Sequence, residues 1–338
     1  MGAPSSKKSL FLFITCMMYF YVIMTSQKHL FYLAPLRGIT DIIFRTSFEK
    51  YFGQFDFLMP PFITTVKGEK VALYHIKDIS SGENDRKRVI PQIIGNDPED
   101  MLKLASCMHD LGYHTVNWNL GCPFTPVTRK KRGSGLLPYP ELIKSILDKL
   151  IPALPCSFSV KVRLGLDEKH ELSKVIPVLN DYPLSEVIIH PRTGSQEYSG
   201  TVDLDSFELY TAQCRHTVVY NGDIFTADDF KRLSERFPGI NRWMLGRGVV
   251  KYPFLLEALR SGKTQTEFSK LRLFHDDLYA GAKETLSGPS HILGRMKGLW
   301  LYMAGSMPEG QKLLKKIQKT KSLSAYERLI DSVLKQIS

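Results

Sequence analysis

From His29 onward, the chain alternates short apolar runs with longer segments whose apolar residues recur at helical spacing. The short runs predict buried strands, and the longer segments predict amphipathic helices. The expected strands are 31–34, 55–59, 89–94, 115–119, 158–162, 186–190, 217–220 and 242–245. The expected helices are 41–51, 98–111, 140–151, 168–180, 204–213, 227–237 and 253–259. Between the second and third strands the pattern is less regular, with one apolar cluster at 71–76.

Strands separated by helices are expected to pair in parallel, because each helix carries the chain back to the start of the next strand. Closure of eight such strands into a (β/α)8 barrel, the TIM barrel, buries all of them. The alternative is an open doubly wound sheet, which favours a G-x-G-x-x-G turn after the first strand. That turn reads Ala34-Pro35-Leu36-Arg37-Gly38 instead. The sequence therefore predicts an α/β protein with a TIM barrel.

The strand pattern stops near Thr264, and a C-terminal all-helical domain is expected after it. Its expected helices are 271–286, 292–303 and 311–318. We therefore predict a barrel domain over 29–263 and a helical domain over 264–338. The helical part is rich in lysine and arginine, and the aromatics Trp300 and Tyr302 lie among them. Such a segment is either a solvated helix face or a nucleic-acid surface, and the segment alone supports both equally.

The first 28 residues have a different character. Lys7 and Lys8 precede an apolar stretch, 10–24, in the manner of a signal peptide. The stretch is too short for a comfortable membrane span, and no small-residue cleavage site follows it. We interpret residues 1–28 as an apolar extension, with Met24 as a plausible alternative start. A membrane anchor is the competing interpretation.

A chain of 338 residues that is 43% hydrophobic and 23% charged can bury a large core, which argues against disorder. Its five cysteines are odd in number and widely spaced, as expected of free thiols in a reducing compartment such as the cytoplasm. The formal net charge of +11 favours a polyanionic partner, either nucleic acid or an anionic membrane surface. The alternative is a merely basic soluble protein without such a partner.

Polar residues stand at the carboxyl end of nearly every predicted strand, in positions where a core would favour apolar side chains. They are Arg37, Gln92, Asn119, Cys122, Lys161, Arg163, His190, Arg192, Asn221 and Arg247. In a barrel these strand ends converge on one mouth, where barrel enzymes carry their active sites. The pattern therefore predicts an active site at that mouth.

Cys122 lies on the loop that follows the fourth strand. Its thiol is a candidate nucleophile, general acid, metal ligand or packing group. A metal is the least supported of these, because no second cysteine or histidine stands at ligand spacing. Pro123 restricts the backbone after the thiol, and Gly133 and Gly135 would allow close approach of a ligand.

Two glycine turns follow the last two strands, Asn221-Gly222-Asp223 and Gly246-Arg247-Gly248. Backbone N–H groups in such turns, beside an arginine and a helix start, form phosphate sites, and these are the loops in which barrels hold phosphates. The two turns together indicate a phosphorylated cofactor or substrate.

Lys161 interrupts an otherwise apolar strand. If it points into the barrel, it must meet a negative group or lose its proton, because an unpaired buried charge is unfavourable. A reduced flavin, anionic around N1 and the C2 carbonyl, would be such a group, and the amide of Gln92 could match its pyrimidine edge. The alternatives are an outward-facing Lys161 and, for His190, a satisfied core histidine.

These residues resemble a known family, the tRNA-dihydrouridine synthases, over nearly the whole chain from His29. The matching strings are LAPLRGITD from Leu33, PQIIG from Pro91, NLGCP from Asn119, RGSGLL from Arg132, SVKVRLG from Ser159, IIHPRTGSQEYSG from Ile188, YNGDI from Tyr220 and MLGRG from Met244. No single string is decisive, whereas their order and spacing across the strand ends are specific.

The resemblance implies a barrel that binds FMN and a helical domain that binds tRNA. It implies reduction of the C5–C6 double bond of particular uridines, with hydride transfer from the reduced flavin to C6 of an extruded uracil. Cys122 would protonate C5, and NADPH would reduce the flavin again. A cytoplasmic monomer is expected, without a metal, a stable protein partner or membrane contact.

The resemblance also implies the site residues. Cofactor contacts would be Ala34, Pro35, Leu36, Gln92, Lys161, His190, Asn221, Gly222, Asp223, Gly246 and Arg247. Substrate contacts would be Asn119, Arg163, Arg192, Arg295 and Lys297.

Two other functions compete with this one. The first is a small-molecule FMN oxidoreductase, such as a dihydroorotate dehydrogenase, docked on a membrane by the apolar leader; the basic helical domain argues against it. The second is a non-catalytic RNA-binding protein that has kept the fold. Cys122 and the full set of predicted flavin contacts argue against the second.

Overall fold

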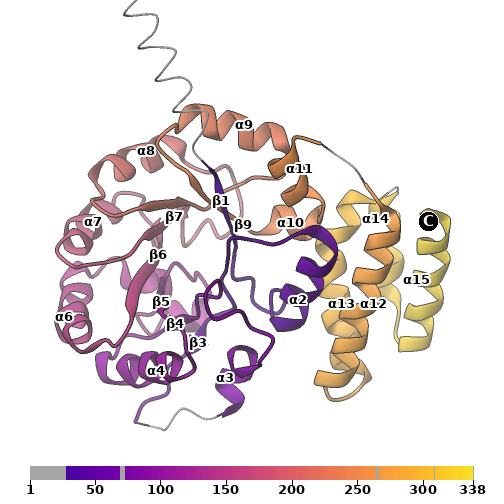
Figure 1. The fold of residues 1–338 in the computed structure, drawn as a ribbon, viewed down its shortest axis with the longest axis horizontal. Helices are drawn as coiled ribbons and strands as arrows, with labels where there is room; N and C mark the ends of the chain where they lie inside the picture. The colour runs from indigo at the N-terminus through magenta and orange to yellow at the C-terminus, as the bar shows by residue number, and fades with distance from the viewer. Residues whose placement is uncertain (1–27, 69–72, 264–265, 308, 338) are drawn as a thin grey trace, which may run out of the picture.

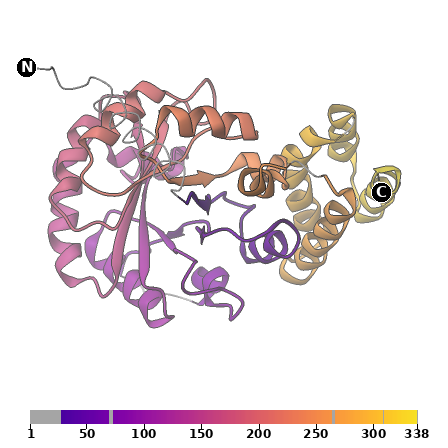
Figure 2. The same ribbon diagram turned by 45° about the horizontal axis from the view of Figure 1, so that its top comes forward.

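The computed structural model describes residues 28–68, 73–263, 266–307 and 309–337 (Figure 1). The expected N-terminal extension lies outside these residues except for Lys28. Within the same ranges, no helix combines the length and the apolar character that crossing a bilayer requires. A barrel occupies the first part of the chain, and the helices after residue 266 form a bundle on one side of it (Figure 2).

Nine parallel strands form a single sheet in the described part of the chain. They are β1 Leu30–Leu33, β2 Phe57–Leu58, β3 Ile63–Thr64, β4 Gln92–Ile94, β5 Thr115–Leu120, β6 Ser157–Gly165, β7 Val187–Thr193, β8 Val218–Tyr220 and β9 Arg242–Leu245. Their spatial order is β2-β1-β9-β8-β7-β6-β5-β4-β3.

The sheet closes on itself through a parallel bridge between Leu58 and Val89. The Leu58 N–H donates to the Arg88 carbonyl at 2.9 Å, and the Ile90 N–H donates to the Leu58 carbonyl at 2.9 Å. The segment leading into β4 therefore pairs with β2. The ring consists of β1, β2 and β4 to β9, which confirms the predicted (β/α)8 barrel.

The strand β3 pairs with β4 on the edge that faces β2, because β5 occupies the other edge, so β3 continues the β2 side of the ring after a break at Pro60-Pro61. The sequence pattern did not predict it, because two residues after the Pro60-Pro61 pair are too few to show a period. The second strand is also shorter than expected, since only Phe57 and Leu58 of 55–59 are in the strand. The remaining strands lie where the apolar runs predict them, within a few residues at each end.

Helices cover the outside of the barrel (Figure 1). They are α2 Ile42–Phe52, α3 Leu73–Ser80, α4 Pro98–Asp110, α6 Pro140–Leu150, α7 Leu172–Asn180, α8 Leu204–Gln213, α9 Ala227–Arg236, α10 Arg247–Lys251 and α11 Leu255–Ser261, with the 3-10 turn η2 Ile151–Ala153. The short helix α5 Thr125–Thr128 and the 3-10 turn η1 Gly133–Leu136 lie on the loop that follows β5. Side-chain capping bonds stabilise the first turn of several of the outer helices. Asp41 and Asp203 accept bonds from backbone N–H groups of the first turn, and Thr226 forms a capping box with Asp229.

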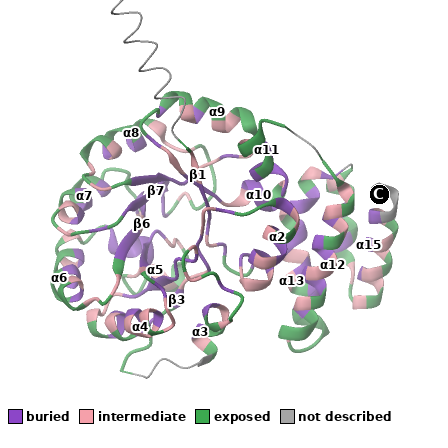
Figure 3. Ribbon diagram, in the orientation of Figure 1, coloured by how far each residue is buried: buried purple, intermediate pink, exposed green. Residues whose placement is uncertain are grey.

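Buried residues gather on the strands and on the helices around them (Figure 3). The apolar core among them has two parts. The larger one lies between the sheet and the helices, and a smaller cluster fills the barrel interior: Tyr32, Ala34, Met59, Ile90, Ile188, Val219 and Met244. At the amino-terminal end of the barrel, the Glu186 carboxylate accepts bonds from Tyr32 Oη and Arg242 Nη1, both at 2.8 Å. The barrel is therefore filled at this end, which leaves the carboxyl ends of the strands for a site.

The C-terminal bundle consists of α12 Phe268–Thr285, α13 Pro289–Met303, η3 Ala304–Ser306, α14 Gly310–Lys319 and α15 Leu323–Ile337. The all-helical character is confirmed, although α15 was not predicted. Trp300 does not lie on a nucleic-acid surface, because it is fully buried and its Nε1–H donates to Tyr326 Oη at 2.8 Å. The two aromatics in the basic segment are thus not equivalent, since Tyr302 is only half-buried.

Arg295 connects the bundle to the barrel. Its Nη2 donates to the Ile39 carbonyl at 2.9 Å and to the Asp41 carboxylate at 2.7 Å. Asp41 is also the N-cap of α2, so this contact joins α13 to the loop that leaves β1. Lys50 and Tyr51 add a second connection through the Asp277 carboxylate, each at 2.9 Å.

We predict that Arg295→Gln lowers the free energy of unfolding by about 1 to 3 kcal/mol, the usual effect of losing hydrogen bonds to a charged group. The measurement is urea denaturation followed by circular dichroism. Arg328→Gln is the control, because the Arg328 side chain is exposed and has no partner in the described residues. Equal stability of the two variants would show that Arg295 does not hold the helical bundle to the barrel.

Candidate active site

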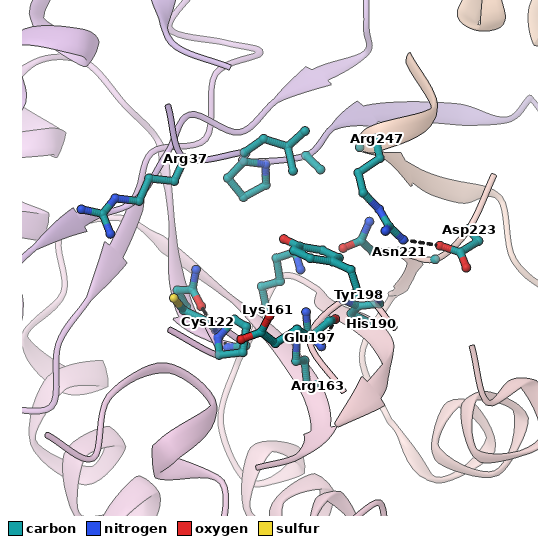
Figure 4. A pocket seen from close by; sticks show the side chains of 18 of the residues that line it. Arg37, Cys122, Lys161, Arg163, His190, Glu197, Tyr198, Asn221, Asp223 and Arg247 are labelled. Atoms are coloured by element: carbon teal, nitrogen blue, oxygen red, sulfur yellow. Dashed lines mark hydrogen bonds and ion pairs between the residues drawn. The ribbon is translucent and has the colours of Figure 1, made fainter. Parts of the chain in front are cut away.

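A cavity of about 410 Å³ opens at the carboxyl ends of the strands (Figure 4). Most of the residues expected at the mouth lie on its wall: Ala34, Pro35, Leu36, Asn119, Cys122, Lys161, Arg163, His190, Asn221, Gly222, Asp223, Gly246 and Arg247. Arg37, noted from its strand-end position, lines it as well. The barrel thus brings together side chains from residues as far apart in the chain as Ala34 and Arg247.

Four predicted contacts are absent from this wall: Gln92, Arg192, Arg295 and Lys297. Several lining residues were not predicted: Pro61, Phe62, Phe124, Glu197, Tyr198 and Phe225. Tyr198 and Glu197 lie within the quoted string IIHPRTGSQEYSG, so a signal for them was present. The others are apolar loop residues, which no periodicity distinguishes from surface positions.

Asn119 holds the cysteine loop in place. Its Oδ1 accepts the backbone N–H groups of Gly121 at 2.9 Å and of Cys122 at 2.8 Å. On the other side of the loop, the Cys122 carbonyl accepts from both the N–H and the Oγ–H of Ser134, each at 3.0 Å. The backbone at Cys122 is therefore bonded on both its amide and its carbonyl.

Asn119 is itself the end of a chain of buried hydrogen bonds. Its Nδ2 donates to Gln92 Oε1 at 2.6 Å, Gln92 Nε2 donates to Asn117 Oδ1 at 2.7 Å, and Asn117 Nδ2 donates to Ser159 Oγ at 2.8 Å. Gln92, Asn117 and Ser159 have no exposed surface. The chain crosses β4, β5 and β6, so it ties the cysteine loop to the rigid sheet. Gln92 lies beneath Asn119 instead of on the cavity wall.

The glycines after the cysteine serve the loop itself. A Cβ at Gly133 would lie 2.6 Å from the Cys122 carbonyl oxygen, and one at Gly135 would lie 2.4 Å from the Thr128 carbonyl oxygen. Neither glycine lines the cavity. The expectation that they admit a ligand is therefore wrong: they allow the loop to fold back onto itself beneath Cys122.

Cys122 presents a thiol to the cavity. Burial raises the pKa of this thiol above its ordinary value, against smaller opposite effects of the Phe124 backbone N–H and of nearby cations. The group is therefore protonated at neutral pH. A protonated thiol at the wall of a cavity is a proton donor, which favours the general-acid role over the nucleophile role.

Lys161 projects into the same cavity from β6 (Figure 4). Burial and the neighbouring Arg163 guanidinium lower the pKa of the Lys161 amine to about 7. Its Nζ has no hydrogen-bond or ion-pair partner among the residues that the structure describes. The outward-facing alternative is therefore wrong, and the amine is free to meet an anionic ligand.

Arg163 and His190 complete the floor of the cavity. Arg163 Nη1 donates to the carbonyls of Thr193 and Glu197, both at 2.7 Å, and burial lowers the pKa of the guanidinium to about 10. Burial and the surrounding cations lower the pKa of His190 well below its ordinary value. His190 is therefore neutral, and the positive charge of the floor comes from Lys161 and Arg163.

The last two strand ends form a corner around Asp223. Its carboxylate accepts from Arg192 Nη2 at 2.5 Å and from Arg247 Nη2 at 2.7 Å. Arg192 is 1% exposed and lies behind the wall, so it supports Asp223 instead of facing a ligand. A Cβ at Gly222 would lie 2.2 Å from Tyr220 Oη, which explains why the turn requires glycine there.

Aromatic rings at the mouth stack with arginines. The Arg247 guanidinium carbon lies 4.6 Å from the centre of the Tyr198 ring, and that of Arg163 lies 5.5 Å from it. On another side, the Arg37 guanidinium carbon lies 5.1 Å from the Phe124 ring. Tyr198 and Phe124 are each 47% exposed. Flat surfaces beside cations are suited to a planar, electron-rich ring.

We predict that Asn117→Leu loosens the cysteine loop although residue 117 does not line the cavity. The substitution leaves Gln92 Nε2 without its acceptor, which should lower the free energy of unfolding by roughly 1 to 3 kcal/mol. It should also raise the rate of Cys122 alkylation, measured by mass spectrometry of the Cys122 peptide. Asn117→Asp is the control, because a carboxyl there can still bond to both neighbours. Identical alkylation of Cys122 in all three proteins would contradict a role for the chain.

The similarity to known proteins extends over the barrel and most of the helical bundle. Residues 32–323 match the model of the dihydrouridine synthase family. The chain is 30% identical to tRNA-dihydrouridine synthase B of Pasteurella multocida over 239 residues, covering 69% of this chain and 70% of that one. It is 27% identical to the tRNA-dihydrouridine(16) synthase of Aquipseudomonas alcaligenes, covering 88% and 98% respectively.

Among solved structures, histamine dehydrogenase from Rhizobium sp. 4-9 superposes with a TM-score of 0.53 at 10% identity. The superposition covers 69% of this chain and 45% of that one, and it supports the barrel fold alone. The family model spans the ring of strands, the cysteine loop and most of the helical bundle. This chain therefore belongs to the dihydrouridine synthase family.

Proposed function

We propose that this protein is a flavin-dependent tRNA-dihydrouridine synthase, which reduces the C5–C6 double bond of uridine in tRNA. Family membership supports the reaction class. The observation that carries the proposal is the protonated Cys122 thiol, held by backbone bonds on the wall of the cavity that Lys161 also enters. An acid and an anion-binding cation at one cavity are what reduction of an electron-poor double bond requires.

The cavity residues fit FMN. Lys161 Nζ has no partner in the described chain, which suits the anionic N1 and C2 carbonyl side of a reduced flavin. Backbone of Ala34, Pro35 and Leu36 would flank the ring. The corner at Asn221, Gly222, Gly246 and Arg247 would hold the phosphate, where barrels of this type usually bind one. When bound, the flavin would supply a hydride from N5 to C6 of the uracil.

Cys122 would complete the reduction. As hydride adds to C6, electron density develops at C5, and the thiol proton moves to that carbon. The C5–C6 double bond becomes a single bond, one hydrogen arrives at each carbon, and the thiolate regains a proton from solvent. Asn119 would keep the thiol in position through the loop backbone, and Gln92 would act through Asn119.

Arg163 and the arginines at the mouth would orient the uracil. Uracil offers two carbonyl oxygens as acceptors, and Arg163 and Arg37 supply donors from two sides of the cavity. The base must leave its stack to reach a cavity within the barrel. His190, neutral and buried beside Lys161, would pack against the bound ring.

The helical bundle would bind the tRNA backbone. Exposed cations gather on and just after α14: Lys312, Lys315, Lys316, Lys319 and Lys321. Lys297 instead donates to the carbonyls of Gln318 at 2.9 Å and Thr320 at 2.6 Å, so it caps α14. Arg295 is bonded to Asp41 of the barrel. Both residues first expected to contact tRNA would therefore act by holding structure, Lys297 within the bundle and Arg295 between the bundle and the barrel.

The reductant, the compartment and the oligomeric state complete the proposal. NADPH would be the reductant that returns the flavin to its reduced form, and tRNA would be the only stable partner of a cytoplasmic monomer. Among the described residues, no group of three or more His, Cys, Asp and Glu side chains is arranged to hold a metal. Acid catalysis by a thiol needs none.

We predict that Cys122→Ala lowers dihydrouridine formation at least about 100-fold, the usual contribution of a general acid. Flavin reduction by NADPH should stay within about twofold of the native rate, because the thiol donates no proton in that step. Nucleoside mass spectrometry of treated tRNA gives the first rate, and flavin absorbance gives the second. Cys214→Ala is the matched control, since that thiol lies outside the cavity. Native protein that reduces a small enone but forms no dihydrouridine would favour a small-molecule oxidoreductase.

We predict that reduced FMN binds less tightly as the pH rises above 7. The pKa of Lys161 is about 7 in the free protein, so the amine loses its proton as the pH rises through that value, whereas a bound anion holds the proton. The dissociation constant should therefore increase by up to about tenfold per pH unit above 7. Anaerobic titration between pH 6.5 and 9 measures it.

Lys161→Arg is the control for this profile, because a guanidinium stays charged over the whole range. It should bind with little pH dependence above 7. Lys161→Met should bind weakly at every pH. A flat profile in the native protein would mean that the amine does not contact the anionic side of the flavin.

A further inference from the structure

Three exposed cations stand in a row beside the cysteine loop. Arg129, Lys130 and Lys131 follow α5 directly, and all three are exposed. None of them forms an ion pair within the part of the chain that the structure describes. A charge run is often only a solvated face, so its role depends on what surrounds it.

The backbone of this run is held rigidly. Asn96 Nδ2 donates to the Lys130 carbonyl at 3.0 Å, and Arg132 Nε donates back to Asn96 Oδ1 at 3.0 Å. Arg132 Nη1 also reaches the Thr65 carbonyl at 3.2 Å. These bonds tie the run to the loops that follow β3 and β4. The cations therefore project from a fixed platform at the mouth of the barrel.

Exposed aromatic rings flank the cations. Lys131 Nζ lies 4.1 Å from the centre of the Tyr139 ring, which is 42% exposed. At the other end, exposed Phe124 carries the Arg37 guanidinium against its face. We call Phe124, Arg129, Lys130, Lys131 and Tyr139 together the far rim. Cations interleaved with exposed rings are the composition of surfaces that bind single-stranded RNA.

The far rim lies across the mouth from the helical bundle. The bundle packs against α2 and α10, which follow β1 and β9. In the ring of eight, β5 is four strands away from β9 in either direction, and the far rim follows β5. Figure 3 shows the same arrangement, with α5 on the side of the barrel away from α12 and α13. A molecule that touches both surfaces must pass over the cavity.

We propose that the far rim is a second RNA-binding surface, which holds the RNA backbone on the side of the mouth opposite the helical bundle. This proposal rests on the proposed tRNA substrate. A strand held at both ends over the cavity presents one nucleotide to Cys122, and the far rim supplies phosphate contacts on one side of that nucleotide. The bundle alone would leave the RNA free to pivot away from the mouth.

The test replaces Arg129, Lys130 and Lys131 together by glutamine. We expect the dissociation constant for unmodified tRNA to rise roughly tenfold at physiological salt, because each lost phosphate contact removes part of the counterion-release free energy. The slope of log Kd against log salt should fall by about 2 to 3. Filter binding at four salt concentrations measures both quantities. FMN content and NADPH-dependent flavin reduction should match the native protein.

A matched variant controls for net charge. Lys149, Arg215 and Lys231 are exposed, unpaired in the described structure and absent from the cavity wall, and their replacement by glutamine removes the same three charges. We expect its salt slope to stay within about 0.5 of the native value, since these residues would touch no phosphate. If both triple variants bind tRNA alike, the far rim is not an RNA surface.

Two further outcomes are distinguishable. Native protein that binds no tRNA would overturn the proposed function itself, whereas tight native binding with an unchanged far-rim variant overturns only the second surface. Should the triple variant lose its flavin or its cooperative unfolding, the single variant Lys130→Gln replaces it in the test. In the described chain Lys130 is bonded through its backbone carbonyl and not through its side chain, so this substitution should leave the fold intact. Its salt slope should fall by about 1, and a native slope would contradict the proposal.

Discussion

The closure of the sheet between Leu58 and Val89 is the constraint on which the rest of the molecule depends. Without this closure β2 and β4 would lie at opposite edges of an open sheet. Ala34 and Leu36, which follow β1, could then not share a cavity with Cys122 and Lys161. Closure places the carboxyl ends of all the strands around one mouth. The same closure gives that mouth two opposite sides, one beside the helical bundle and one beyond β5. Charged groups on one side therefore lie across the cavity from charged groups on the other.

Within the ring, the polar chain from Ser159 to Asn119 replaces apolar packing with hydrogen bonds. An apolar interior of equal volume would be at least as stable, because buried amides gain little net free energy from their bonds. The contribution of the amides is to fix the orientation of the side chains in the network. Asn119 Oδ1 must accept, since both of its partners at the loop are backbone N–H groups, and this fixes the orientation of each amide down to Ser159. These bonds also position the Cys122 thiol, because Asn119 Oδ1 accepts the backbone N–H of Cys122.

Sequence reasoning predicted the ring, the mouth and most of its lining, because strand periodicity and the position of polar residues at strand ends are local features. It failed where a partner decides the role of a side chain. Gln92 and Arg192 have the right strand-end positions, yet one is covered by Asn119 and the other by Asp223. Trp300 looks like a surface aromatic among lysines until Tyr326, from a helix that the pattern missed, covers it. Such contacts depend on segments far apart in the chain, and no local pattern encodes them.

The placement of Arg192 also explains how an acidic residue would be tolerated in the corner proposed to hold a phosphate. Asp223 shares its carboxylate between buried Arg192 and more exposed Arg247. If Arg247 turned toward a phosphate, an isolated Asp223 would repel that phosphate and would lose a partner in a partly buried site. Arg192 stays bonded to Asp223 and to the carbonyls of Ser199 and Gly200, so it keeps the carboxylate neutralised from behind. Arg247 is then able to exchange one anion for another without leaving an unpaired charge.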